Sequence, residues 1–495
     1  MTILRLGAFC FFTFIFASAS YSQTEKAQRN LFKDSTSAFV EISGLAGSTS
    51  RTPFWIQANQ FGIIPRTSPS GSVRAQIEKY YPLNLKGTWR LGFGIDAVAN
   101  GAQQSKFLLP QIHATLRFKN WEFFVGRKQQ WIGLADSTLG TGSYVWSGNA
   151  LPTQRIQFGT SRFVAVPFTR GWISFNGFYS EGLFDNNRPV TSDLKLHQKM
   201  FYVRIGRASS ILKLYGGVNH QVEWGGKSPY FTIDGKMPNG IQNYLKLITG
   251  RFGDASAVIS DFDNRNRVGN HLGTIDMAME IESYEHSWFI YRQNIYEDGS
   301  LYAFANIKDG LNGVRFRRKN SYGSNFEIKE VVLEFLFTKS QGGPKNDLAD
   351  TTLARGSLGK DDYFNNAQVR DGWSNHDRTI GTPFITPTSD TNWKWPNYAN
   401  FYTSNNRVSV FHLGLKGTFY QQFFWTSKLS YSSNMGTYDE RFKGSPTQFS
   451  GLLTVQRNID ALGGMTVSAA LAADIGDLYP KNYGFRLGLR KDFSF

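Results

Sequence analysis

The last thirteen residues, YGFRLGLRKDFSF (483–495), alternate between two kinds of side chain. The odd positions from Tyr483 to Phe495 are apolar except for Lys491, and the even positions carry glycine, arginine, aspartate or serine. Because successive side chains of a β-strand point to opposite faces, the segment would present one apolar face and one face rich in arginine and glycine. A frayed terminus needs no such pattern, so we expect the chain to end in a strand.

The first 22 residues have the organisation of a secretory signal. Arg5 precedes an apolar run at residues 6–17, and the small-residue stretch SASYS follows it. The run is too short to span a bilayer comfortably, which favours cleavage after Ala19 or Ser22 over a retained anchor helix. The only cysteine, Cys10, lies inside this run. The mature chain is therefore expected to be exported and to form no disulfide or thiolate metal site.

The composition of the remaining chain is that of a protein with half-apolar strands. The 495 residues are 41% hydrophobic and 15% aromatic, and the mean hydropathy is -0.34. After the signal no apolar run approaches the roughly 18 residues of a spanning helix. A transmembrane β-barrel combines these properties, because its strands face lipid on one side and the lumen on the other. A closed barrel also satisfies every backbone hydrogen bond without an open edge.

Several segments repeat the alternation of the C-terminus. They lie at Tyr81–Ala97, Leu108–Phe118 followed by a turn at Lys119-Asn120, Leu212–Val218, Ile275–Ile281 and Met465–Ile475. These patterns run for roughly nine residues or more, near the length of a tilted membrane strand, whereas soluble strands average about five or six. We therefore prefer an all-β, antiparallel outer-membrane barrel to a soluble sandwich or propeller. At roughly 26 residues per strand and connection, the length allows about 18 strands, with 16 as an alternative.

This prediction divides the chain into three parts. Residues 1–22 form the signal, 23–75 form a lead-in with the first strand and a segment that can plug the barrel from the periplasm, and 76–495 form the barrel. Within the barrel, residues 338–400 lack sustained alternation, and connections of that length are usually functional or disordered. This stretch contains more aromatic residues than disordered loops usually do. We expect a long, ordered extracellular loop.

Four stretches resemble one known family in the same order along the chain. They are RTPFWIQANQFGIIP (51–65), DDYFNNAQVRDGWSNHDRTIGTPF (361–384), NRVSVFHLGLKG (406–417) and LSYSSNMGTY (429–438). Together they are similar to the outer-membrane capsule assembly family, the Wzi-type proteins, in a Bacteroidetes-like form. The resemblance implies a bacterial outer-membrane barrel that binds capsular polysaccharide at the cell surface and helps to assemble or attach the exported polymer.

The long loop contains residue types that bind sugars. Aromatic rings stack on the apolar faces of sugars, and charged or amide side chains pair with hydroxyl groups. The candidate polysaccharide-binding residues are Tyr363, Trp373, His376, Arg378, Trp393 and Trp395. The aromatic residues among them could equally pack the loop against the barrel mouth, because an ordered loop needs a core of its own.

The net charge of +16, from 54 Lys and Arg against 38 Asp and Glu, suggests an acidic polymer as partner. Five basic residues fall on the predicted lumen face: Lys86, Arg90, Arg117, Arg486 and Arg490. Attraction to anionic lipid head groups is the alternative, if such charges lie near the membrane rims. Nucleic acid is not an expected partner at the cell exterior.

We expect no catalytic residues, metal or cofactor. The seven histidines are scattered, and no Ser, His and Asp set or metal-ligand spacing is recognisable. The competing function is a porin or sugar-selective channel, because a barrel of this size can enclose a pore. We expect a monomer whose partners are surface polysaccharide, outer-membrane lipid and the barrel insertion machinery. The family resemblance implies that this machinery recognises the terminal Phe495 as an assembly signal.

Overall fold

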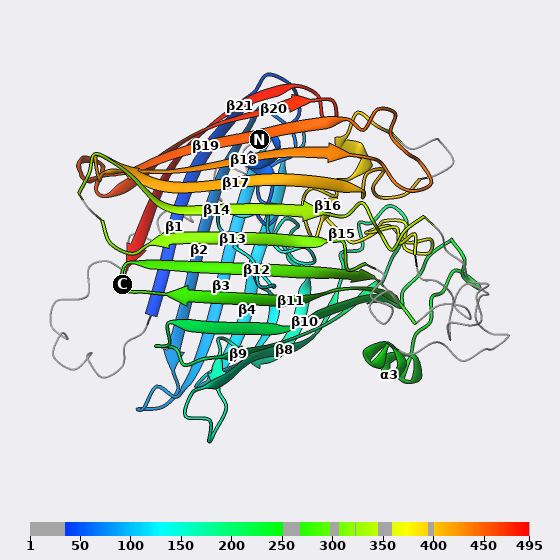
Figure 1. Ribbon diagram of the computed structural model, residues 1–495, viewed down its shortest axis with the longest axis horizontal. Helices are drawn as coiled ribbons and strands as arrows, with labels where there is room; N and C mark the ends of the chain where they lie inside the picture. The colour runs from blue at the N-terminus through cyan, green and yellow to red at the C-terminus, as the bar shows by residue number, and fades with distance from the viewer. Residues whose placement is uncertain are drawn as a thin grey trace, which may run out of the picture.

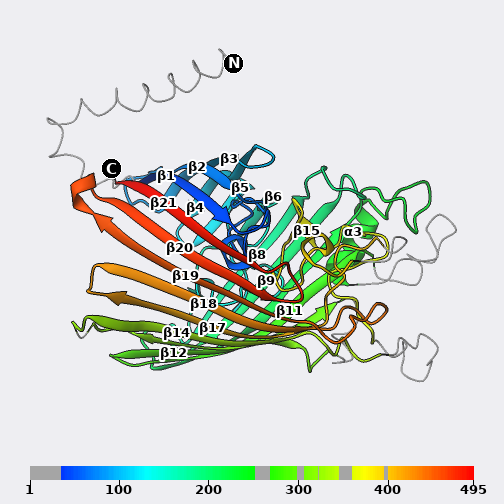
Figure 2. The same ribbon diagram turned by 90° about the horizontal axis from the view of Figure 1, so that it is seen from above.

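The computed structural model describes residues 35–250, 268–297, 306–321, 323–344, 359–394 and 400–494. Over these residues the chain forms a closed, antiparallel β-barrel of 18 strands (Figures 1 and 2). The first ten elements of the wall are β1 (Ser35–Gly47), β2 (Ser70–Pro82), β3 (Trp89–Gly101), β4 (Lys106–Phe118), β5 (Trp121–Arg127), β6 (Gln154–Thr160), β7 (Val164–Ala165), β8 (Ile173–Leu183), β9 (Lys195–Ile205) and β10 (Leu212–Trp224). The remaining nine are β11 (Asn270–Glu282), β12 (His286–Glu297), β13 (Gly310–Arg318), β14 (Phe326–Phe337), β17 (Val408–Phe419), β18 (Phe423–Asn434), β19 (Thr447–Ile459), β20 (Met465–Gly476) and β21 (Asn482–Ser494). Both β6 and the short β7 pair with β8, so these two elements share one position in the barrel.

The cylinder closes where the first strand meets the last. β1 and β21 are antiparallel, with Ala38 opposite Phe493 and Gly47 opposite Gly484. Closure satisfies the backbone groups of both edge strands, as a hydrocarbon environment requires. The predicted barrel and its strand number are confirmed.

The alternation at the C-terminus also behaves as expected. The outward side chains of β21 include Tyr483, Phe485, Leu487 and Leu489, which are exposed on the outer wall. Arg486 and Arg490 point to the other face, where they contact Glu41 and Phe39 of β1. The apolar face of the terminal strand therefore faces lipid.

The alternating segment Tyr81–Ala97 is not one strand, in contrast to its sequence pattern. β2 ends at Pro82 and β3 begins at Trp89, and the Thr88 backbone N–H donates to the Asn84 side chain across the turn at 2.9 Å. Gly87 has a φ of +60°, which favours glycine. The turn spans an even number of residues, so the period of two continues through it and hides the break.

The long connections lie at one end of the barrel, and the strand ends of β1 and β21 nearest the termini lie at the other (Figure 2). Outer-membrane barrels have short periplasmic turns and longer extracellular loops, so we assign the long-loop end to the cell exterior. Among the described helices, none has the length and apolar character needed to cross a membrane.

Short elements occur in the connections at this end. They are α2 (Phe54–Gln57), the hairpin strands β15 (Ser374–Asn375) and β16 (Arg378–Thr379), the 3-10 turn η2 (Thr388–Asp390), and α3 (Ile241–Thr249). The 3-10 turn η3 (Asp460–Leu462) joins β19 to β20 at the opposite end. Leu247 of α3 packs with Val222 and Trp224 of β10, which places this helix against the outer wall.

Three connections fold inward and fill the lumen: residues 48–69, 128–153 and the described parts of 338–407. We call them together the plug. Carboxylates on the inner wall hold the backbone of the plug: the Asp276 side chain accepts from Leu134 N–H at 2.8 Å, and Asp474 accepts from Phe54 N–H at 2.9 Å. Hydrogen bonds to ionised acceptors are stronger than neutral ones. Polar side chains of the inner wall therefore bind the backbone of the plug and do not only face water.

The plug segments also pack on each other across the lumen. Tyr144 stacks on Phe364 with ring centroids 5.3 Å apart, and Phe54 lies against Phe384 at 4.9 Å. These residues belong to one buried apolar cluster that also includes side chains of the wall. A continuous core across the lumen is the arrangement of a plugged barrel.

Candidate functional site

The β15–β16 hairpin belongs to the plug and lies toward the long-loop end of the barrel (Figure 1). Its two turn residues, His376 and Asp377, both have positive φ, 49° and 60°. Two-residue turns of this kind match the twist of a hairpin but are unfavourable for most residues that carry a Cβ atom. Such backbone strain persists only where surrounding contacts fix it, and it occurs frequently at functional sites.

Contacts on both sides fix this tip. Arg66 donates to the Asp377 carbonyl oxygen at 3.1 Å and forms an ion pair with Asp390. On the other side His376 contacts the Asp185 carboxylate, which also accepts from Arg127 at 2.8 Å. We refer to Arg66, Asp185, His376, Asp377 and Asp390 as the mouth cluster.

Arg378 follows Asp377 of the mouth cluster in the hairpin and is buried. Its guanidinium donates to the Gln57 side chain at 2.9 Å and to the Ile64 carbonyl oxygen at 2.5 Å. Burial, together with the nearby charge of Arg66, lowers the pKa of Arg378 to about 10. A small polar crevice lined by Arg51, Asn149 and Arg378 opens at this point. Arg378 therefore joins two plug segments and is only 7% exposed.

Two of the three carboxylates in the mouth cluster are paired with basic groups: Asp390 with Arg66, and Asp185 with His376 and Arg127. Burial opposes ionisation of Asp185, but the contacts with His376 and Arg127 hold its pKa below the usual value. The carboxylate therefore stays ionised and keeps its neighbours in place. A rigid set of charged donors and acceptors at a solvent-accessible mouth can bind hydroxyl and carboxylate groups of a polymer.

The aromatic residues predicted to bind sugar do not form one exposed surface. Tyr363 and Trp373 are fully buried, and the Tyr363 hydroxyl donates to Asp309 at 2.8 Å. Trp393 is partly exposed: it stacks on Phe442 with centroids 4.8 Å apart and donates through Nε1 to the Asp477 carbonyl oxygen. Trp395 lies outside the described residues. Tyr363 and Trp373 therefore pack the loop, which was the alternative to sugar binding for these rings.

The predicted basic residues lie mostly on the inner wall and are distributed along it. Arg117 pairs with Glu122, Arg486 with Glu41, and Arg490 with Asp492. Arg90 lies near the periplasmic end of β3 and is exposed. Lys86 differs from the prediction, because it lies in the β2–β3 turn rather than on a strand. Their acidic partners weaken the attraction that these residues could exert on a polymer.

Of the mouth cluster, sequence reasoning identified only His376 and missed Arg66, Asp185, Asp377 and Asp390. Arg66 and Asp390 are 324 positions apart in the sequence and meet only in the folded plug. The proximity of Arg66 to the stretch at 51–65 is the only local signal. Within the described ranges, no group of three or more His, Cys, Asp or Glu residues is arranged to hold a metal ion.

Comparison with known proteins agrees with this architecture. The family model described as capsule assembly protein Wzi matches residues 44–391, more than half of the chain. The chain belongs to the Wzi capsule assembly family. Membership in this family and the barrel fold place the protein in the bacterial outer membrane. A search of curated protein sequences found no match.

Solved structures with a similar fold include a member of the same family. The Escherichia coli protein Wzi, described as an outer membrane protein involved in group 1 capsule assembly and a carbohydrate-binding β-barrel, has a TM-score of 0.56 at 14% identity, with 92% of this chain and 85% of that chain covered. Pseudomonas aeruginosa OpdQ has a TM-score of 0.47 at 9% identity, covering 94% of this chain and 99% of that one. The Wzi structure supports the fold.

Proposed function

We propose that this protein binds capsular polysaccharide at the extracellular mouth of its plugged barrel and so helps to hold the exported polymer at the cell surface. The observation that carries the proposal is the combination of a packed core across the lumen with a rigid, charged mouth cluster above it. A filled lumen suits a protein that presents a surface to a polymer, and family membership supplies the biological context. The proposed role is non-catalytic.

The mouth offers both kinds of contact that a sugar chain uses. The Asp377 side chain is exposed at the hairpin tip, beside His376 and Arg66. Trp393 presents a partly exposed ring, and the neighbouring Lys394 is exposed. Carboxylates and amines pair with hydroxyl groups, whereas the indole face packs on C–H groups of a pyranose ring. Asp377 and Trp393 are therefore our main candidates for direct contact.

An acidic polymer is the preferred partner. The chain carries a net charge of +16, and this positive field attracts polyanions. The paired lumen arginines add little at the mouth, so the selectivity is expected to depend on overall charge and on exposed lysines such as Lys394. The preference for an acidic polymer should weaken as the salt concentration rises, because exposed charges are screened.

Capsule retention on cells tests the proposal. A strain lacking the gene would be complemented with the wild type, Asp377→Gly, Trp393→Ala, or the control Gln242→Ala on α3, and cell-attached and released polymer would be measured. Glycine accepts the positive φ at position 377, so the first variant removes the carboxylate without straining the turn. We expect the two mouth variants to release more polymer at equal surface expression. Retention equal to that of the wild type in both would contradict the proposal.

A further inference from the structure

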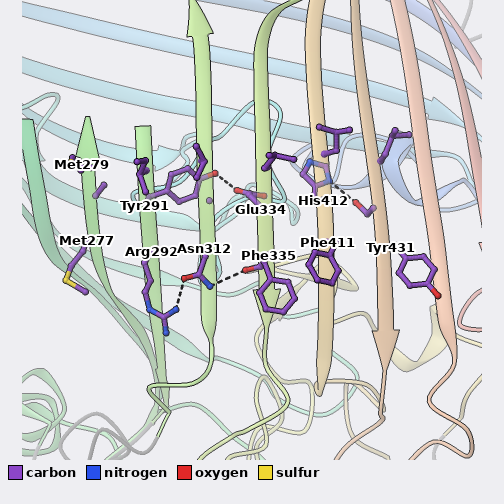
Figure 3. A pocket seen from close by; sticks show the side chains of 18 of the residues that line it. Met277, Met279, Tyr291, Arg292, Asn312, Glu334, Phe335, Phe411, His412 and Tyr431 are labelled. Atoms are coloured by element: carbon purple, nitrogen blue, oxygen red, sulfur yellow. Dashed lines mark hydrogen bonds between the residues drawn. The ribbon is translucent and has the colours of Figure 1, made fainter. Parts of the chain in front are cut away.

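A single row of side chains crosses the outer wall from β11 to β18. Cross-strand pairing aligns Met277, Arg292, Asn312, Phe335, Phe411 and Tyr431. Figure 3 shows these side chains at one level across neighbouring strands. Met277, Phe411 and Tyr431 are each at least half exposed, so the row faces outward, where the barrel meets lipid. Arg292 is thus a cation in a lipid-facing row.

The level of this row on the wall is defined by its neighbours. The adjacent outward row toward the periplasm is entirely aliphatic or thioether: Met279, Ile290, Val314, Leu333, Leu413 and Leu429. On the extracellular side, the next outward row is mixed: it contains Asn294, Gly310, Ser409 and Ser433, together with the apolar Ile275 and Phe337. Aromatic residues of outer-membrane barrels gather at the interfaces of the apolar band. The row therefore lies where the outer wall changes from entirely apolar to mixed side chains, near the extracellular limit of the apolar band.

Arg292 is held in place by neutral oxygen atoms. Its Nε donates to Asn294 at 2.7 Å, Nη1 donates to Asn312 at 2.6 Å, and Nη2 donates to the Ile307 carbonyl oxygen at 2.6 Å. The remaining contact, with the Asp309 carbonyl oxygen, is also to the backbone. Among the described residues no carboxylate forms an ion pair with Arg292. A fixed guanidinium that has no carboxylate partner within the described ranges favours an anionic partner at a membrane surface.

The wall beside Arg292 is hollowed. An open, largely apolar groove runs along the outer face of β11–β18, and its lining includes Met279, Ile290, Leu333 and Leu413 together with Arg292 and Asn312. Methionine side chains adapt to irregular apolar ligands. The groove is continuous with the surface that contacts the membrane, and Arg292 and Asn312 lie toward its extracellular side. An acyl chain in the groove would place its head group near Arg292.

We propose that this wall is a binding site for a membrane lipid with an anionic head group. The acyl chains lie in the groove over the aliphatic row, and the head-group phosphate or carboxylate pairs with Arg292. This site is on the outside of the barrel and does not depend on the mouth cluster. It gives the outer wall a specific lipid contact in addition to general solvation by the bilayer.

Native mass spectrometry of the purified full chain in detergent tests this site. The probes are dioleoyl phosphatidylglycerol, which is anionic, and dioleoyl phosphatidylcholine, which is not. Arg292→Gln removes the charge, Arg292→Lys keeps it, and Arg457→Gln is the matched control because Arg457 is an exposed arginine near the periplasmic end of β19. Folding of every variant is checked by heat-modifiable migration.

We expect the wild type and the Arg457→Gln control to bind phosphatidylglycerol about tenfold more tightly than phosphatidylcholine, as one charge-assisted contact allows. Arg292→Gln should lose this preference and Arg292→Lys should retain most of it. Equal binding of both lipids by the wild type, or an unchanged preference in Arg292→Gln, would overturn the proposal. Displacement of the lipid by millimolar inorganic phosphate would overturn the assignment of the groove to acyl chains.

Discussion

The Asp474 carboxylate on β20 accepts a hydrogen bond from the backbone N–H of Phe54 at 2.9 Å, although the two residues are 420 positions apart in the sequence. The same oxygen accepts from Arg51 at 2.7 Å, and the other oxygen accepts from Ser450 at 2.7 Å. One wall carboxylate thus ties the start of α2 to the inner surface near the end of the barrel that carries the plug.

Replacing this carboxylate should loosen the first plug segment. Asp474→Ala leaves Arg51 and the Phe54 N–H without their acceptor, a loss of about 3 kcal/mol or more for a buried charged contact. Amide exchange over residues 48–69 should then accelerate on the order of a hundredfold, and brief current bursts should appear in planar bilayers. Asp474→Asn retains an acceptor for the Phe54 N–H but loses the ion pair with Arg51, so its exchange should lie between those of the wild type and Asp474→Ala. Unchanged exchange in Asp474→Ala would show that the plug is held elsewhere.

The two tryptophans of the long loop should respond differently to truncation. Trp373 is fully buried, so Trp373→Ala should cost about 3–5 kcal/mol and make the loop sensitive to protease. Trp393 is partly exposed, and Trp393→Ala should weaken polymer binding without increasing cleavage. Limited proteolysis of intact cells separates the two effects. Equal protease sensitivity of both variants would contradict the assigned packing.

Acidification should stabilise the loop through Asp362. Burial raises the pKa of Asp362 to about 6, although Asn406 and Asn365 oppose the shift by donating hydrogen bonds. The unfolded value is about 4, so the folded state binds the proton more tightly. This contribution to stability is complete below about pH 4 and is lost as pH rises to about 6, a change of up to about 3 kcal/mol.

Thermal unfolding in detergent between pH 4 and pH 7 checks this linkage. Asp362→Asn mimics the neutral side chain, so the stability of the wild type relative to the variant should fall as pH rises. The difference between the two proteins isolates this one group from all others that titrate. A pH-independent difference would exclude Asp362 as the source.

Removal of the C-terminus should impair assembly more than stability. Phe493 pairs with Ala38 in the closing strands, whereas Phe495 lies outside the described residues. By burial alone, the loss of each phenylalanine in this segment costs at most about 3 kcal/mol. Deletion of residues 493–495 should nevertheless leave little heat-modifiable barrel in the outer membrane, and Phe495→Tyr should insert normally. Normal surface labelling of the truncated protein would refute the assembly-signal prediction.

The barrel could be predicted from the sequence because its signal is local. Each strand that faces lipid on one side has a period of two, and the C-terminal strand repeats it to Phe493. The same periodicity does not reveal the end of a strand when the turn that follows has an even number of residues, as at residues 83–88. Residues 23–75 were predicted to form a lead-in with the first strand and a segment that could plug the barrel from the periplasm. In the structure, residues 48–69 enter the lumen from the opposite end of β1.

The site was less predictable because its contacts are long-range. An aromatic residue in a polar loop has the same local sequence whether it packs inward, like Trp373, or is partly exposed, like Trp393. The ion pair between Arg66 and Asp390 depends on two plug segments that meet inside the barrel. Only the tertiary fold could show that Arg378 is buried and links two plug segments through its hydrogen bond to Gln57.

Binding of purified capsular polysaccharide to the purified barrel tests the central claim most directly. The affinities of the wild type, the double variant Asp377→Gly/Trp393→Ala and the control Gln242→Ala would be measured at low and physiological salt, with acidic and neutral polymers. We predict that the wild type and the control bind the acidic polymer, that the double variant binds at least about tenfold more weakly, and that salt weakens binding. Binding that is unchanged in the double variant, or absent in the wild type, would contradict the account of a plugged barrel with a polymer-binding mouth.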